Sequence, residues 1–147
     1  MLEFATSELA NSGVFLRASR DGKNPAYSGC EVQILDDANW ERATGSTLQP
    51  WQFTGSLYGA VPPATREALK PVGEWNAMRI RFEGSRLAVE LDGVPLYDVD
   101  TNELAVEPRF ADRAREGFIG LQRHGAAKGG HASTVRFRNL FVRRIGR

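Results

Sequence analysis

A run of alternating residues between positions 76 and 99 constrains the fold more than any other feature of the sequence. From Asn76 to Phe82 the even positions are amide or apolar, and the odd positions are alanine or arginine. This period of two predicts a strand with one buried face. Residues 86–91 alternate in the same way, and Asp92-Gly93 is a two-residue hairpin signal before residues 94–99. We therefore predict a three-stranded antiparallel meander over residues 76–99.

Further short strands are predicted along the rest of the chain. Residues 54–60 are a weaker candidate, and the alternation within residues 134–143 changes phase, which a β-bulge near Asn139 would reconcile. Residues 64–70 could form about two helical turns. The remaining predicted strands are residues 2–7, 13–18, 31–35 and 117–124. Many short antiparallel strands in 147 residues predict one all-β domain over residues 1–147, a β-sandwich or a barrel.

The composition narrows the classes of function. A formal charge of +1 gives no electrostatic reason to expect nucleic acid or an anionic membrane as a partner. No apolar run is long enough for a membrane helix, and residues 1–4 show no secretion signal. One cysteine and two histidines exclude, in practice, a structural zinc site. Phosphate-loop, dinucleotide-binding and Gly-x-Ser-x-Gly motifs are absent from the sequence.

Glu31 is the first candidate for chemistry. It shares one face of the predicted strand 31–35 with Gln33, and two polar residues at central positions of a strand are unusual. A pair of catalytic carboxylates on this strand would need an acid where Gln33 stands, so an ordinary retaining glycosidase is not expected. The same pattern is compatible with an outer face in contact with solvent.

His124 is the second candidate, because it shares a predicted strand face with Gly120 and Gln122. Polar groups beside a glycine are typical of a sugar-binding face, and histidine transfers protons near neutral pH. A surface histidine at a strand end is an equal alternative. Arg17 shares a predicted face with Phe15 and could hold sugar hydroxyls, or pair with an acid on a neighbouring strand.

Four aromatic residues could stack against sugar rings. Aromatic side chains are more often part of a core, and this is the interpretation we favour for Trp75, directly before the meander. Cys30 begins a predicted strand without a basic neighbour in sequence, so a catalytic role for its thiol is not expected. The four aromatic candidates are Trp40, Trp51, Tyr58 and Trp75.

Seven segments, in this order, resemble those of a known family. They are NSGVFLR (11–17), GCEVQILD (29–36), TGSLYG (54–59), GEWN (73–76), LDGV (91–94), GFIGLQRHG (117–125) and VRFRNL (135–140). The resemblance extends from about residue 2 to residue 145. In these segments the chain resembles the 3-keto-disaccharide hydrolase-like family, whose fold is a concanavalin-like jelly-roll sandwich.

The resemblance implies a sheet face that holds a carbohydrate, an oxidised di- or oligosaccharide, and in active members cleavage of glycosides that are oxidised at C3. A 3-keto group acidifies the proton on C2, so one base and one acid are sufficient for elimination of the glycosidic oxygen, and water then adds. We expect Glu31 and His124 to transfer protons. The residues expected to position the sugar are Arg17, Gln33, Tyr58, Asn76 and Gln122.

The sequence departs from the family pattern before the first motif. Family members usually carry about two more strands before the first motif, whereas this sequence has ten residues there. We therefore expect an open sheet edge, which a second copy of the chain could cover.

Family members are commonly exported. No ligand spacing argues for a metal, and no cofactor is assigned. The alternatives to an enzyme are a carbohydrate-binding module and a structural domain.

Overall fold

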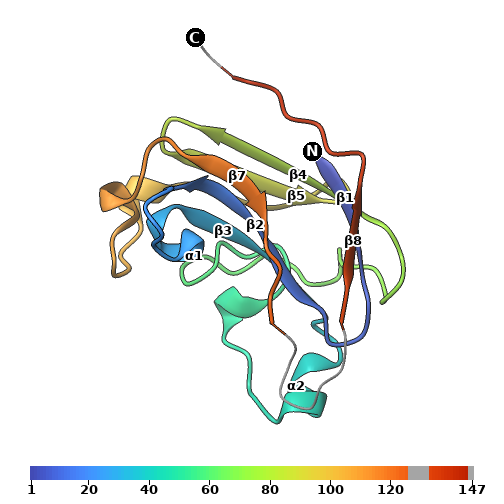
Figure 1. Ribbon diagram of the computed structural model, residues 1–147. Helices are drawn as coiled ribbons and strands as arrows, with labels where there is room; N and C mark the ends of the chain where they lie inside the picture. Colours follow the sequence, from blue (N-terminus) through green and yellow to red (C-terminus); the bar gives the residue numbers. More distant parts are fainter. Residues whose placement is uncertain (126–132, 146–147) are drawn as a thin grey trace.

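The computed structural model describes residues 1–125 and 133–145. The described residues form two antiparallel β-sheets (Figure 1). The larger sheet has the strand order β6-β5-β4-β1-β8, and the smaller has the order β3-β2-β7. The larger sheet contains β1 (Leu2–Thr6), β4 (Asn76–Glu83), β5 (Arg86–Leu91), β6 (Val94–Asp100) and β8 (Val135–Arg138). The smaller contains β2 (Asn11–Ala18), β3 (Cys30–Leu35) and β7 (Phe118–Leu121). The predicted all-β sandwich is confirmed.

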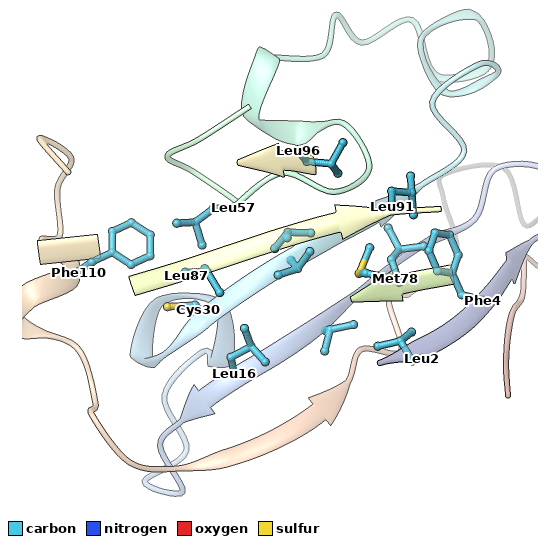
Figure 2. Close-up of a cluster of buried hydrophobic side chains, with 14 residues drawn as sticks. Leu2, Phe4, Leu16, Cys30, Leu57, Met78, Leu87, Leu91, Leu96 and Phe110 are labelled. Atoms are coloured by element: carbon cyan, nitrogen blue, oxygen red, sulfur yellow. The ribbon is translucent and has the colours of Figure 1, made fainter. Parts of the chain in front are cut away.

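The core lies between the two sheets (Figure 2). Val32 and Ile34 of β3 are fully buried there, as are Met78 of β4 and Val89 of β5. Their positions in the sequence alternate with polar or half-buried residues, so each strand presents one apolar face to the core. The other face of the smaller sheet is therefore free to carry polar side chains.

The predicted meander is present. β4 pairs with β5 from Met78↔Leu91 onward, and β5 pairs with β6. Asp92 and Gly93 have φ angles of +48° and +81°, the left-handed conformation that this two-residue hairpin requires. The hairpin predicted from Asp92-Gly93 is therefore confirmed.

Two predicted elements are wrong. Residues 54–60 form no strand, because Gly55 and Gly59 turn the chain with φ angles of +85° and +78°, and only Leu57 makes isolated bridges. Residues 64–70 form no helix. The N–H of Ala64 instead donates to the carbonyl of Leu96 at 3.0 Å, which ties the segment to β6.

The helices of the structure are short and were not predicted. Helix α1 (Pro25–Ser28) has Asn24 as its N-cap, and the Asn24 side chain accepts a hydrogen bond from Ala26 N at 3.0 Å. Helix α2 (Trp40–Thr44) ends at a left-handed glycine. Three single turns of 3₁₀-helix occupy Pro50–Gln52, Thr101–Glu103 and Phe110–Asp112. These turns and helices connect the strands, and α1 and α2 flank the face of the smaller sheet that is turned away from the core.

The chain leaves the sheet after β8. The predicted strand over residues 134–143 is too long: β8 ends at Arg138, and Asn139 follows with a φ angle of +51° instead of forming a bulge. Beyond it, Phe141 and Met1 exchange two backbone hydrogen bonds of 2.8 and 2.9 Å.

An apolar groove of about 630 Å³ lies beside β7 and the segment that follows β8. Ile119 and Phe141 are 56% and 62% exposed in it. The groove is also lined by Val14, Leu16, Ile80, Phe82, Leu121, Leu140, Val142 and Ile145.

Among the described residues, the helices are all far too short and polar to cross a membrane.

Candidate functional site

A pocket of about 180 Å³ opens on the face of the smaller sheet opposite the core. Its floor comes from β3, from Asn11 of β2 and from the residues after β7, and its walls come from α1, α2 and the 48–58 segment. The lining residues are Asn11, Asn24, Ala26, Tyr27, Glu31, Gln33, Leu35, Trp40, Leu48, Gln52, Tyr58, Gln122 and His124.

Strand β3 is buried on both of its faces. Glu31 and Gln33 alternate with the core residues, yet they are only 3% and 4% exposed. The 54–58 segment covers this edge: Gln33 N donates to Ser56 O at 3.0 Å, and Tyr58 N donates to Glu31 O at 2.9 Å. The alternative in which Glu31 lies on a solvated outer face is therefore wrong, because residues of α1, α2 and the 48–58 segment wall in this face of the strand.

Gly13 makes room for the Glu31 side chain. It stands on β2 directly opposite Gln33. A Cβ atom at position 13 would lie 2.8 Å from Cγ and 2.9 Å from Cδ of Glu31, and closer still to Oε1. The carboxyl thus lies across a position that only glycine leaves open, a role that the sequence analysis did not identify.

The environment of Glu31 favours the neutral carboxyl group. Burial raises the pKa of Glu31 to about 7, and the hydrogen bond from the Gln122 side chain opposes this shift. A carboxyl group that titrates near neutral pH can accept or release a proton during a reaction.

Two carboxamide oxygens near this carboxyl have no partner. Oε1 of Gln33 and Oε1 of Gln122 are both buried without a hydrogen bond. The backbone of Gln122 is fixed, because its N–H donates to Gly13 O at 2.8 Å and its carbonyl accepts from Ser12 Oγ at 2.7 Å. Both oxygens belong to residues that line the pocket.

Aromatic residues supply part of the wall. Tyr58 and Trp40 line the pocket, and Trp51 supports the Tyr58 ring edge-on with 5.1 Å between the centroids. Burial raises the pKa of the Tyr58 hydroxyl above its usual value. His124 lies exposed at the pocket, with Nδ1 3.0 Å from the carbonyl of Gly125. A polar floor with aromatic walls suits a sugar ring.

Five of the seven residues that the sequence analysis selected therefore line one pocket: Glu31, Gln33, Tyr58, Gln122 and His124.

Arg17 does not line the pocket. The pairing of β2 with β7 shifts between Phe15 and Ala18, and Arg17 has a φ angle of +53°. This irregularity breaks the alternation on which the prediction for Arg17 rested. The guanidinium instead lies 3.6 Å from the centroid of the Phe82 ring and donates to Gly84 O at 2.6 Å.

Asn76 also lies away from the pocket. It is 1% exposed at the start of β4, in the other sheet. Its Oδ1 accepts from Lys70 N at 2.9 Å, and its amide donates to Glu74 O at 3.3 Å. These bonds hold the 70–76 turn, so the side chain is engaged in the fold.

The prediction that Trp75 belongs to the core is wrong. Trp75 is half-buried, and the guanidinium groups of Arg138 and Arg136 lie 4.0 and 5.3 Å from its ring centroid. Strand β8 brings these arginines to the ring because every second residue of β8 points to the same face.

The sequence analysis missed several lining residues, namely Asn11, Asn24, Ala26, Tyr27, Leu35, Leu48 and Gln52. Asn24 carries a local signal, since an asparagine before a proline is a typical helix start. Leu35 follows Glu31 and Gln33 in the same phase of β3, so strand alternation could have found it. The remaining residues reach the pocket from β2, from α1, from the 3₁₀ turn at 50–52 and from the segment before that turn, and no short sequence signature marks this arrangement.

Neither a metal site nor a reactive thiol is evident in the described residues. Across residues 1–125 and 133–145, no three His, Cys, Asp or Glu side chains gather as metal ligands would. Cys30 is buried in the core, and this burial raises the pKa of its thiol to about 11. The thiol is thus protonated at neutral pH and is no nucleophile.

A model of the 3-keto-alpha-glucoside-1,2-lyase-like domain matches residues 1–143. A 3-keto-disaccharide hydrolase of Bacteroides thetaiotaomicron is 28% identical over 172 residues, which cover 97% of this chain and 56% of that protein. This chain therefore spans about half the length of that relative.

Solved structures share the fold. A crystal structure from Parabacteroides distasonis, of a protein provisionally assigned as a glycosyl hydrolase, is 30% identical with a TM-score of 0.75, and the match covers 94% of this chain and 73% of that one. A second structure of the same description and organism has a TM-score of 0.72 at 24% identity, with coverage of 92% and 66%.

Proposed function

Because the chain belongs to the 3-keto-alpha-glucoside-1,2-lyase-like family, we propose that its pocket binds glycosides already oxidised at C3 and cleaves their glycosidic bond. The substrate class is a 3-keto-disaccharide or another 3-keto-glycoside. The observation that carries the proposal is the Glu31 carboxyl: it is 3% exposed, titrates near pH 7 and lines a pocket together with a histidine.

The proposed reaction is an elimination followed by hydration. A base removes the proton from C2, which the neighbouring ketone acidifies. The electron pair of the C2–H bond forms the C1=C2 double bond, the C1–O bond breaks, and an acid protonates the departing oxygen. Water then adds its hydroxyl to C1 and a proton to C2, which restores the 3-keto sugar. No oxidant or reductant is consumed.

We assign the two proton transfers to Glu31 and His124, which both line the pocket. The Glu31 carboxylate accepts the C2 proton, since its raised pKa makes it a stronger base than an ordinary carboxylate. We assign protonation of the departing oxygen to His124, which lines the pocket and is exposed to solvent.

Gln33, Gln122 and Tyr58 are the residues that we propose to position the sugar, with Trp40 as part of the stacking wall. Arg17 and Asn76 are left out of the proposal, because their polar groups are engaged elsewhere in the fold.

The test is turnover of 3-keto-trehalose and 3-keto-glucosides beside the same sugars in unoxidised form. We expect cleavage of the keto substrates only. Glu31→Gln and His124→Ala should each lower kcat/KM by at least about a hundredfold, the scale of general acid–base catalysis. Glu67→Gln, the same exchange at an exposed position outside the pocket, is the matched control and should be unaffected.

The same experiment discriminates between an enzyme and a carbohydrate-binding module. A binding module requires no acid–base pair, so it would bind sugars and leave every keto substrate intact. Sugar binding without turnover in the unmodified protein would overturn the enzymatic proposal.

A further inference from the structure

Two buried hydrogen-bond acceptors in the pocket lack a donor. Oε1 of Gln33 and Oε1 of Gln122 are unpartnered, and Gln33 as a whole is only 4% exposed. Buried polar atoms are nearly always paired, because an unpaired one loses its hydrogen bonds to water without compensation. Two unpaired acceptors in one pocket therefore point to groups that a ligand supplies.

The backbone donors next to Gln33 are already engaged. Gln33 N donates to Ser56 O at 3.0 Å, and Gly55 N donates to Gln33 O at 2.8 Å. The Gln122 side chain lowers the pKa of the Glu31 carboxyl, and its own Oε1 has no hydrogen-bond donor. Glu31 is itself an acceptor when ionised. The floor of the pocket is thus rich in acceptors.

We propose that the oxygens of Gln33 and Gln122 select the substrate by accepting hydrogen bonds from two hydroxyl groups of one sugar ring. The part of this inference that concerns the C3 ketone rests on the proposed function. A carbonyl oxygen has no hydrogen to donate and is repelled by another acceptor. The C3 ketone is therefore oriented away from these two oxygens, and two of the remaining ring hydroxyls, at C2, C4 or C6, face them.

The test uses binding of methyl glucoside and its four monofluorinated analogues, in which fluorine replaces the hydroxyl at C2, C3, C4 or C6. Fluorine is similar to a hydroxyl in size but cannot donate. Binding is measured by calorimetry or by ligand-detected NMR. Two of the C2, C4 and C6 analogues should bind about three- to tenfold more weakly than the parent, the range for one lost neutral hydrogen bond. The C3 analogue should bind like the parent.

Variants identify the acceptors. Gln33→Met and Gln122→Met keep the length of the side chain and remove an unpartnered buried oxygen. Each should bind the parent sugar about three- to tenfold more weakly. Each should also lose its discrimination against one fluorinated analogue, a different one for each variant. Asn102→Ala, on an exposed turn outside the pocket, should keep the full pattern.

The outcomes separate this inference from the proposed function, because binding of unoxidised sugars needs no turnover. Intact discrimination in both methionine variants would overturn the inference, even if keto substrates are cleaved. Loss of binding for all ligands alike, without any change in discrimination, would also count against it. The predicted pattern without turnover of keto substrates would support the inference and refute the enzymatic proposal.

Discussion

The buried carboxyl of Glu31 makes the stability of the protein depend on pH. Its pKa is about 7 in the folded chain against an ordinary value of 4.5, so between these values the folded state binds more protons than the unfolded state. Stability therefore falls as pH rises from about 4.5 through 7. Asp37 adds to the same trend, because burial raises its pKa to about 6.

Replacing Glu31 by Gln should remove its part of this dependence. We expect the Glu31→Gln variant to gain stability relative to the unmodified protein as pH rises from 5 to 8, by up to about 3 kcal/mol. Thermal unfolding of both proteins at constant ionic strength measures this difference, and the contribution of Asp37 cancels. Parallel curves of melting temperature against pH would contradict the assigned shift.

Gly13 is expected to be essential for the position of Glu31. In Gly13→Ala the new methyl group would overlap the Glu31 side chain, which must leave its rotamer. We expect a fall in kcat/KM of at least about tenfold, since catalytic groups tolerate little displacement, with the fold retained by circular dichroism.

Gly120→Ala is the matched control for this substitution. The atoms nearest to its Cβ would belong to the rings of Phe118 and Phe15, at 3.0 Å or more, and not to Glu31. Equal activity of the two alanine variants would show that Gly13 does not position the carboxyl.

At the level of elements, the irregular end of β2 joins the two sheets. Arg17 leaves the regular strand and reaches Phe82 and the carbonyl of Gly84 in the β4–β5 hairpin. We expect Arg17→Met to lower the free energy of unfolding by roughly 1–2 kcal/mol, through loss of the cation–π contact and one hydrogen bond.

The same variant should retain its kcat/KM toward keto substrates, because Arg17 lies outside the pocket. Urea unfolding and steady-state kinetics on one preparation measure both properties. A selective loss of activity at unchanged stability would return Arg17 to the substrate-binding site.

The strands were more predictable than the connections between them. The 76–99 meander follows from alternation and from one turn dipeptide, which are local properties. The 54–70 region was misassigned because its conformation depends on partners far away, such as Leu96 for Ala64. Local sequence carries no record of such contacts.

The candidate site was predictable to the extent that strand phase was. Glu31, Gln33 and Gln122 lie on regular strands or directly beyond one, so alternation placed them on one face. Arg17 was misplaced because an unpredicted register shift precedes it. The burial of Glu31 also escaped prediction, since it depends on residues of α1, α2 and the 48–58 segment that wall in this face of β3.

At the scale of the whole molecule, the apolar groove predicts self-association. Strand β7 is the last strand of its sheet in the described part of the chain, and Ile119 and Leu121 on it are 56% and 40% exposed. Exposed apolar surface beside a sheet edge is a typical contact surface. We expect a second copy to cover it, in a two-fold arrangement that pairs like with like.

Sedimentation velocity over a range of concentrations measures this association. Ile119→Ser should shift the protein toward monomer, while Thr65→Ser, at a position remote from the groove, should not. A monomer at every concentration in the unmodified protein would refute the predicted contact.

The placement of the three tryptophans gives the molecule an internal optical reporter. Trp40 lines the pocket, and Trp51 touches it through the Tyr58 ring. Trp75 directly precedes β4 of the larger sheet, and its ring lies against Arg136 and Arg138. A sugar in the pocket should therefore alter the emission of the first two and leave the third as a constant background, so that occupancy can be followed without any label.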